Sequence, residues 1–265
     1  MAESHPAADH PAAPLTDHRA DHLADALPDP VAGATVDEAV FALRPDYRVV
    51  LLAVDGLEPG PSDAVGEALL RRAEASAREL LAERRVEDVE HVAAWRQAYR
   101  SFGAKPQRTR NSLESLMRRA ASGLPRVNRL TDLYNAISVL HRIPLGGEDL
   151  MHYVGPPRLI RSTGTEPFAT TADGVSVIET PPVGEVVWCD DAGVTCRRWN
   201  WRQSLRTRLR EDTTAALFIL DVLEPVTDAA ALAAAAELLD QLPGRALRTT
   251  QRLIGRPHPH GVRHG

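Results

Sequence analysis

The sequence predicts an α+β fold with a helical first half and a strand-rich second half. Two observations lead to this prediction. Apolar residues recur at helical spacing over residues 65–81, 91–100, 111–120 and 130–140, and short apolar runs separated by Gly, Pro and Asp turns follow over residues 158–195. With 265 residues, 43% of them hydrophobic, the chain is long enough to bury a core.

Individual elements follow from local patterns. Two continuous apolar runs, residues 48–54 and 216–222, predict buried strands. Asn111 and Glu114 are spaced like a capping box, which predicts that the third helix begins there. An alanine- and leucine-rich stretch at residues 229–242 predicts a final helix.

Composition predicts the domain boundaries. Residues 1–34 form an acidic, His- and Pro-rich leader without apolar periodicity, and residues 245–265 form a His-rich tail, so we expect both to be disordered. Residues 35–224 are expected to form one domain, followed by a C-terminal helix at residues 225–244. The leader lacks the apolar region of a secretory signal and no apolar run reaches spanning length, so we expect a cytoplasmic protein without membrane contact.

The net charge of -5 hides a strong segregation of charge. Residues 94–130 contain nine Arg or Lys and a single acid, and residues 197–210 contain six Arg and no acid. The first forty residues carry eight acids and one Arg. A basic region on an acidic protein is typical of a local polyanion site, although a solvated helix face is the ordinary alternative.

Two of the four tryptophans, Trp199 and Trp201, lie in one arginine-rich segment. As a strand, this segment would place both indoles on one side and Arg198, Asn200 and Arg202 on the other. Indole faces stack on bases and guanidinium groups bind phosphate, so the pattern favours a nucleic-acid site. The alternative is that both tryptophans are core residues of a half-buried strand.

A polar face is expected near the start of the fourth helix. Asn128, Asp132 and Asn135 fall at i, i+4 and i+7, so their side chains project together, with plain solvation as the default explanation. A Gly146-Gly147 turn follows the helix and leads into Glu148. Paired glycines allow a backbone to approach a ligand closely, which makes this region a candidate pocket.

Motifs that would name a catalytic class are absent. The sequence lacks a nucleophile elbow, a Walker-type loop, a Rossmann fingerprint and a zinc-protease helix. Ser204 has no nearby His, so hydrolysis is expected to use a positioned water, while long-range assembly of Ser204 with His141 or His152 stays open. Cys189 and Cys196 are expected to be reduced thiols, and we expect no metal site and no cofactor.

Four ordered stretches, residues 94–106, 124–135, 143–150 and 196–204, resemble the freestanding B3/B4 domain proteins. These are similar to the tRNA-editing module of the phenylalanyl-tRNA synthetase β subunit. The resemblance covers residues 36–223 and implies a B3/B4-type mixed α/β domain. Its pocket, in the synthetase, hydrolyses tyrosine wrongly esterified to the tRNA.

Only some of the pocket residues of the synthetase module have counterparts in this sequence. An Asn-x-x-x-Asp segment at the synthetase pocket corresponds to Asn128–Asp132, and a Pro-Met-His-Ala-Phe-Asp segment corresponds to residues 144–149. Gly146 stands where that segment has its editing His. Residues 196–204 correspond to a Gly-rich run of the synthetase. The resemblance therefore implies the pocket location, whereas the hydrolytic residues differ.

The resulting hypothesis is a trans-editing hydrolase that cleaves the ester of mischarged aminoacyl-tRNA by substrate-assisted water attack. The predicted pocket consists of Asn128, Asp132, Asn135, Gly146, Gly147, Glu148 and Asn200, in which one acid meets the α-ammonium group. The terminal nucleotide is assigned to Arg197, Arg198, Trp199, Trp201, Arg202 and Ser204. The acceptor stem is assigned to Lys105, Arg108, Arg110, Arg118 and Arg119. Two alternatives remain, a tRNA- or RNA-binding module without catalysis and an amino-acid-binding protein; DNA is not expected as a partner.

Overall fold

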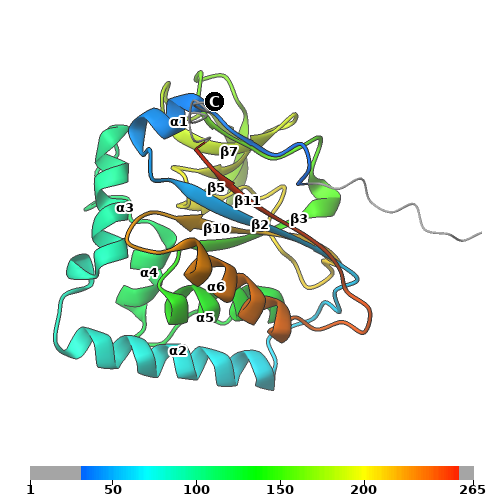
Figure 1. Cartoon of the computed structure of the whole chain (residues 1–265). Helices are drawn as coiled ribbons and strands as arrows, with labels where there is room; N and C mark the ends of the chain where they lie inside the picture. The colour runs from blue at the N-terminus through cyan, green and yellow to red at the C-terminus, as the bar shows by residue number, and fades with distance from the viewer. Residues whose placement is uncertain (1–30, 257–265) are drawn as a thin grey trace, which may run out of the picture.

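A four-stranded sheet runs through the middle of the structure, a computed structural model that describes residues 31–256 (Figure 1). Its strands lie in the order β11–β2–β10–β3, and neighbouring strands are antiparallel. Every residue of β10 is buried, as are the inner residues of β2, because both faces of the sheet are covered. This explains why both strands appear in the sequence as continuous apolar runs. The bounds are Arg48–Asp55 for β2, Leu145–Asp149 for β3, Ala215–Val222 for β10 and Arg248–Gly255 for β11.

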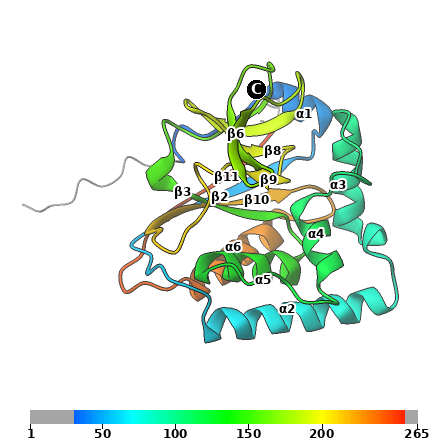
Figure 2. The same ribbon diagram turned by 180° about the vertical axis from the view of Figure 1, so that it is seen from behind.

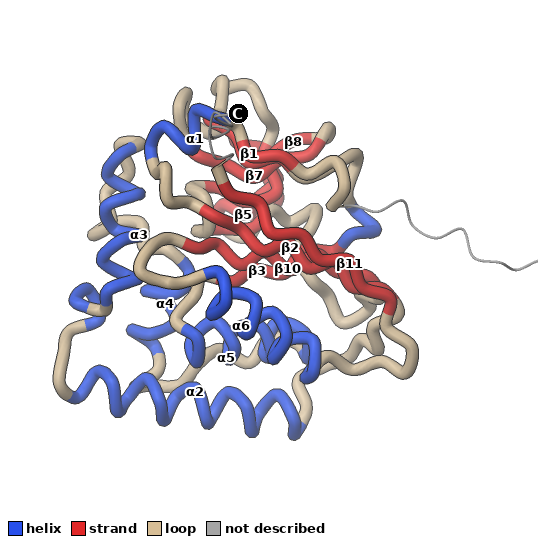
Figure 3. The backbone as a smooth tube through the Cα atoms, viewed as in Figure 1, coloured by secondary structure: helices blue, strands red, loops and turns tan. Residues whose placement is uncertain are grey.

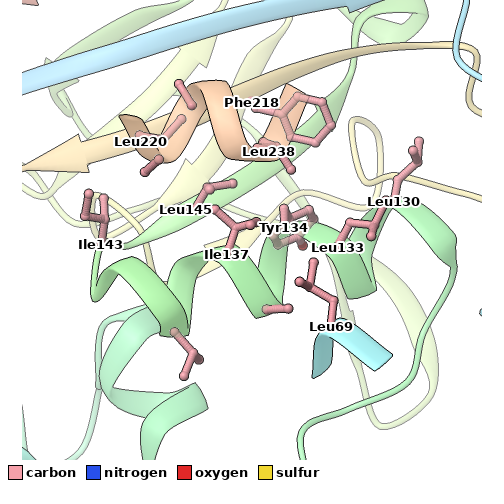
Figure 4. Packing of buried hydrophobic residues seen from close by; sticks show 14 of the residues in the cluster. Leu69, Leu130, Leu133, Tyr134, Ile137, Ile143, Leu145, Phe218, Leu220 and Leu238 are labelled. Atoms are coloured by element: carbon pink, nitrogen blue, oxygen red, sulfur yellow. The ribbon is translucent and has the colours of Figure 1, made fainter. Parts of the chain in front are cut away.

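Three helices lie on one side of this sheet (Figures 1 and 3). They are α2 (Ala64–Ala82), α5 (Arg129–His141) and α6 (Asp228–Gln241). Figure 4 shows Leu133 and Ile137 of α5 and Leu238 of α6 packed near Phe218 and Leu220 of β10. All five side chains are buried, so the apolar stripe that predicted the fourth helix is the layer that joins it to the sheet.

A second, five-stranded sheet lies on the other side, in the order β1–β4–β7–β8–β9 (Figure 2). An aromatic core fills the space between the two sheets and includes Tyr47, Trp95, Trp188 and Trp199. The strands are Thr35–Val36, Arg158–Arg161, Val186–Asp190, Gly193–Arg197 and Arg202–Gln203. The remaining elements are α1 (Glu38–Leu43), α3 (Glu90–Ser101), α4 (Ser112–Arg119), the hairpin of β5 (Phe168–Ala172) and β6 (Val175–Glu179), and two 3₁₀ turns at Val86–Asp88 and Leu150–His152.

The structure confirms the α+β fold, with most helices in the first half and most strands in the second. The predicted cap is also present, since the Asn111 side chain accepts a hydrogen bond from the Glu114 amide at 2.8 Å. No helix of the described part of the chain is long and apolar enough to cross a membrane.

Two local expectations are wrong. The Gly146-Gly147 pair is not a turn but the middle of β3, where it pairs with Ile219 and Phe218 of β10. Residues 248–255 are not part of a disordered tail but form β11, because the exposed edge of β2 offers them a complete hydrogen-bonding ladder. The expected disorder of residues 1–30 and 257–265 lies outside the described residues.

The two glycines of β3 have different surroundings, which gives a matched test of the packing. A Cβ on Gly147 would lie 2.7 Å from Leu209 and 3.0 Å from Tyr134, whereas a Cβ on Gly146 would meet only the flexible end of Gln203 at 3.1 Å. We expect Gly147→Ala to destabilise the protein by roughly 1–3 kcal/mol through overpacking. Gly146→Ala should change stability by much less. Urea unfolding of both variants measures this, and equal losses would contradict the strand register.

Candidate functional site

A cavity of about 270 Å³ lies between the two sheets. Its walls come from β3 and β10 of the central sheet and from β7, β8, β9 and the β8–β9 turn of the second sheet. Helices α4 and α5 contribute further lining residues. Figure 2 shows β8, β9, β10 and α4 close to one another. The cavity is therefore assembled from segments that are far apart in the chain.

The floor of the cavity is formed by alternate residues of β3 and β10. Gly146 pairs with Ile219, and Glu148 pairs with Leu217, so these residues share one face of the sheet. Gly147 points to the opposite face, against Tyr134. Of the two glycines that the sequence assigned to the pocket, the structure thus places only Gly146 in the cavity lining.

Glu148 is a buried acid of this floor. Its Oε2 accepts a hydrogen bond from the Tyr153 hydroxyl, and its Oε1 has no hydrogen-bond partner within residues 31–256. Burial raises the pKa of Glu148 to about 7, against the lowering effect of the Tyr153 hydroxyl. The free oxygen makes Glu148 a ready acceptor for a cationic donor.

Asp221 is a second buried acid that lines the cavity. One of its oxygens accepts a hydrogen bond from the Tyr47 hydroxyl at 2.6 Å, and the other accepts one from the Asn200 amide at 3.3 Å. Burial raises the pKa of Asp221 to about 7, and the charge of Glu148 raises it further. Sequence analysis missed this residue, although an acid inside the apolar run 216–222 was a visible signal.

The segment that contains Trp199 and Trp201 is not a strand. Residues 198–201 form the turn between β8 and β9, in which Arg198 and Trp199 adopt left-handed φ angles of 47° and 67°. Because a turn does not alternate, the expected separation of indoles from polar side chains does not occur. Trp199 is fully buried, with its ring centroid 5.0 Å from that of Tyr47 and 5.2 Å from that of Trp95. The core alternative is therefore right for Trp199.

Trp201 is half-buried and lines the cavity. The guanidinium carbons of Arg198 and Arg202 lie 4.3 Å and 4.4 Å from the centroid of its ring. A base that stacked on this indole would have to displace an arginine, whereas phosphate could bind to arginines that the indole already holds in place. Arg202 is exposed and forms no ion pair with any residue between 31 and 256.

Two other residues assigned to the terminal nucleotide have structural partners. Arg197 is buried and forms ion pairs at 2.8 Å with both Glu185 and Glu179. Ser204 is buried outside the cavity lining, and its hydroxyl donates to the carbonyl of Ala169 at 3.2 Å. Arg197 therefore links β8 to Glu179 of β6 and to Glu185, which precedes β7. Ser204 links the end of β9 to β5.

Of the three polar residues predicted on the fourth helix, only Asn135 lines the cavity. Asn128 is the N-cap of α5, where its side chain accepts a hydrogen bond from the Thr131 amide at 2.9 Å. Asp132 is fully buried, accepts from the Val127 amide at 2.8 Å, and packs near Gly66 of α2. The physical reason is that α5 is buried on nearly all sides, so its polar face meets α2 instead of the cavity.

The predicted basic residues also separate into two groups. Arg118 and Arg110 lie 2.9 Å and 3.8 Å from the buried carboxylate of Glu114, which also binds Arg96 at 2.7 Å. Arg119, the next residue of α4, lines the cavity and is exposed. Three of the exposed basic residues form no ion pair within the described range, namely Lys105, Arg108 and Arg119.

No histidine lines the cavity in the described part of the chain. His91 is buried and bound to the carbonyl of Arg142 at 2.7 Å, and burial lowers its pKa to about 4. His141 pairs with Glu237 at 2.7 Å, and His152 lies 3.4 Å from Asp149. Neither lies beside Ser204 in the contacts that the structure shows, so the long-range serine site is not assembled.

Cys196 lines the cavity, but burial raises the pKa of its thiol well above the ordinary value. The thiol therefore stays protonated at neutral pH and is a poor nucleophile. Cys189 and Cys196 are both free. Between residues 31 and 256 no three His, Cys, Asp or Glu side chains are grouped so that they could hold a metal ion.

A family model for the B3/4 domain matches residues 94–240, more than half of the chain. This chain belongs to the B3/4 domain family. Among solved structures it is similar to an N-terminal fragment of the phenylalanyl-tRNA synthetase β-subunit from Pyrococcus horikoshii, with 13% sequence identity and a TM-score of 0.39. That similarity covers 81% of this chain and 49% of the fragment, so the B3/4 protein spans about half the length of the fragment. No curated protein matches it.

Ionisation of Glu148 should make the B3/4 protein less stable as pH rises. Its folded pKa of about 7 exceeds its unfolded value of about 4.5, so the folded state holds the proton more tightly and stability declines between these two pH values. Replacing Glu148 with Gln removes its share of this decline, while Asp221, whose pKa is also raised to about 7, contributes to a decline in both proteins. We expect wild type to lose on the order of 2 kcal/mol relative to Glu148→Gln between pH 5 and pH 8.

The readout is the difference in urea unfolding between the two proteins. His91, whose pKa is lowered to about 4, acts in the opposite direction over pH 4–6.5 but contributes equally to both proteins. A difference that does not change with pH would show that Glu148 is not the buried acid described above.

Proposed function

We propose that this B3/4 protein is a trans-editing hydrolase that cleaves the ester bond of mischarged aminoacyl-tRNA. The observation that carries the proposal is a cavity with apolar walls and a buried carboxyl oxygen, Oε1 of Glu148, that has no hydrogen-bond partner among the described residues. An aminoacyl group has the complementary features, an α-ammonium group and a side chain. Family membership supports a relation to the synthetase module but not by itself an activity.

The cavity would bind the aminoacyl group at its α-ammonium group and at its side chain. Glu148 Oε1 accepts a hydrogen bond from the α-ammonium group, since it accepts none from residues 31–256 within hydrogen-bonding distance. The side chain of the amino acid lies against apolar lining residues such as Leu116, Trp188 and Ile219. Asn135 supplies an amide group for the ester carbonyl.

A water molecule is the nucleophile in this proposal. Within residues 31–256 the lining includes no histidine, and the Cys196 thiol is protonated at neutral pH. The water oxygen bonds to the ester carbonyl carbon, the bond from that carbon to the ribose oxygen breaks, and the proton of the water passes to the ribose oxygen. The neighbouring ribose hydroxyl assists this transfer, and the products are a free amino acid and an uncharged tRNA.

The tRNA would be held by the basic residues that the fold leaves exposed. Arg119 lines the cavity, and Arg202 is held against Trp201 with no acidic partner among the described residues. Both can meet phosphate groups close to the ester. Lys105 and Arg108, which do not line the cavity, would bind phosphate groups of the tRNA further from the ester.

One observation favours a second function, binding of an amino acid without hydrolysis. The lining residues supply polar contacts but no activated nucleophile, and a binding protein requires only the contacts. A binding protein of this kind would hold a free amino acid and would show no preference for its tRNA ester.

Deacylation of a panel of misacylated tRNAs tests the hydrolase directly. We expect selective release of one class of amino acid, and Glu148→Gln should lower kcat/KM at least tenfold because the α-ammonium group loses its partner. The control is Arg71→Ala, on an exposed part of α2, a helix that contributes no residue to the cavity lining. Absence of deacylation of every tRNA by folded wild-type protein would exclude the hydrolase and leave the binding function.

Binding of uncharged tRNA tests the basic surface separately. We expect Arg119→Ala combined with Arg202→Ala to weaken binding and to reduce the slope of log affinity against log salt by roughly one to two, since each lost phosphate contact lowers it by about one. Arg71→Ala should leave both quantities unchanged. Filter binding at several salt concentrations measures them, and an unaltered slope in the double variant would place the tRNA on another surface.

A further inference from the structure

The two acids of the cavity form no ion pair within residues 31–256. Glu148 and Asp221 both line the cavity and both are buried, with exposures of 1% and 2%. Their hydrogen-bond partners include the neutral side chains of Tyr153, Tyr47 and Asn200. The Thr195 hydroxyl and the charge of Arg206 also lower the pKa of Glu148, and the Trp188 indole lowers that of Asp221.

The two acids stand at separate positions along the cavity floor. Glu148 is paired with Leu217, and the amide of Asp221 donates to the Pro144 carbonyl at the opposite end of β3. Three residues of β10 lie between Leu217 and Asp221, so the backbone positions are roughly 14 Å apart along the strand. The two carboxyl groups are still close enough for the charge of Glu148 to raise the pKa of Asp221. Gly146 lies between them, and the atom nearest to the position of its missing Cβ is the amide nitrogen of Gln203 at 3.1 Å. A ligand that displaces this flexible side chain can extend across the floor from one acid toward the other.

Charge balance then limits the ligand. A buried carboxylate without a counter-ion is costly, so each acid must either hold a proton or meet a cation. One α-ammonium group can compensate only one acid. An extended ligand with a second cation would compensate both, whereas a neutral side chain would leave the second acid to be protonated.

We infer that the cavity selects a ligand with two cationic groups, a basic α-amino acid or its ester, with the α-ammonium group at Glu148 and the side-chain cation at Asp221. This inference rests on the proposed function and adds the substrate class to it. Trp188 and Trp199, which also line the cavity, lie against the aliphatic part of such a side chain.

Binding of two amino-acid amides tests this inference without any hydrolysis. L-lysinamide and L-norleucinamide share an α-ammonium group and a four-carbon aliphatic chain, lack a carboxylate, and differ in the terminal ammonium group. In calorimetric titrations of the wild-type protein at pH 7.5, we expect L-lysinamide to bind at least tenfold more tightly. Equal binding, or tighter binding of L-norleucinamide, would overturn the inference.

Two variants test which acid binds each cationic group of the ligand. In Asp221→Asn the preference for L-lysinamide should fall at least fivefold, because the side-chain cation loses its charged partner. In Glu148→Gln both amides should weaken by a similar factor. An unchanged preference in folded Asp221→Asn would also overturn the assignment, and the wild-type comparison decides the substrate class even when a variant does not fold.

The failure of this inference is distinguishable from the failure of the proposed function. Deacylation of tRNAs that carry neutral amino acids, with no preference for basic ones, would contradict the substrate class and leave the hydrolase in place. Tight binding of L-lysinamide without deacylation of lysyl-tRNA or any other charged tRNA would contradict the hydrolase and leave the ligand class in place.

Discussion

The pairing of β10 with β2 and β3 is the constraint on which the rest of the structure depends. Successive residues of β10 point to opposite faces of the sheet, so Phe218 and Leu220 face the helices while Ile219 and Asp221 face the cavity. A shift of the register by one residue would place Asp221 in the helical core and remove the cavity floor. The same ladder thus determines both the main core and the candidate site.

The turn between β8 and β9 depends on a second set of contacts. Trp199 is buried among Tyr47 and Trp95, which anchors the turn in the aromatic core. The Asn200 carbonyl accepts a hydrogen bond from the Ser112 amide at 3.0 Å, and its side-chain amide reaches Asp221. The turn therefore joins α4 to the central sheet and closes the cavity between them.

The charged residues fall into two groups, those with partners inside the protein and those that can bind a ligand. Arg197 and Arg118 are held by acids, and Asp132 is held by a backbone amide, so these residues stabilise the fold. Glu148 and Arg202 have no charged partner in the described structure. A ligand gains most from groups of the second kind, because binding to them breaks no internal ion pair.

The sequence by itself determined the main helices and the buried strands β2 and β10, since apolar periodicity and capping depend on residues that are close in the chain. It also identified the family and placed Asn135, Gly146, Glu148 and Asn200 near a common pocket. Only the tertiary structure decided that Asn128 caps a helix and that Asp221 lines the cavity. The physical reason is that the direction of a polar side chain depends on which elements pack around it, and that packing joins residues that local patterns cannot relate.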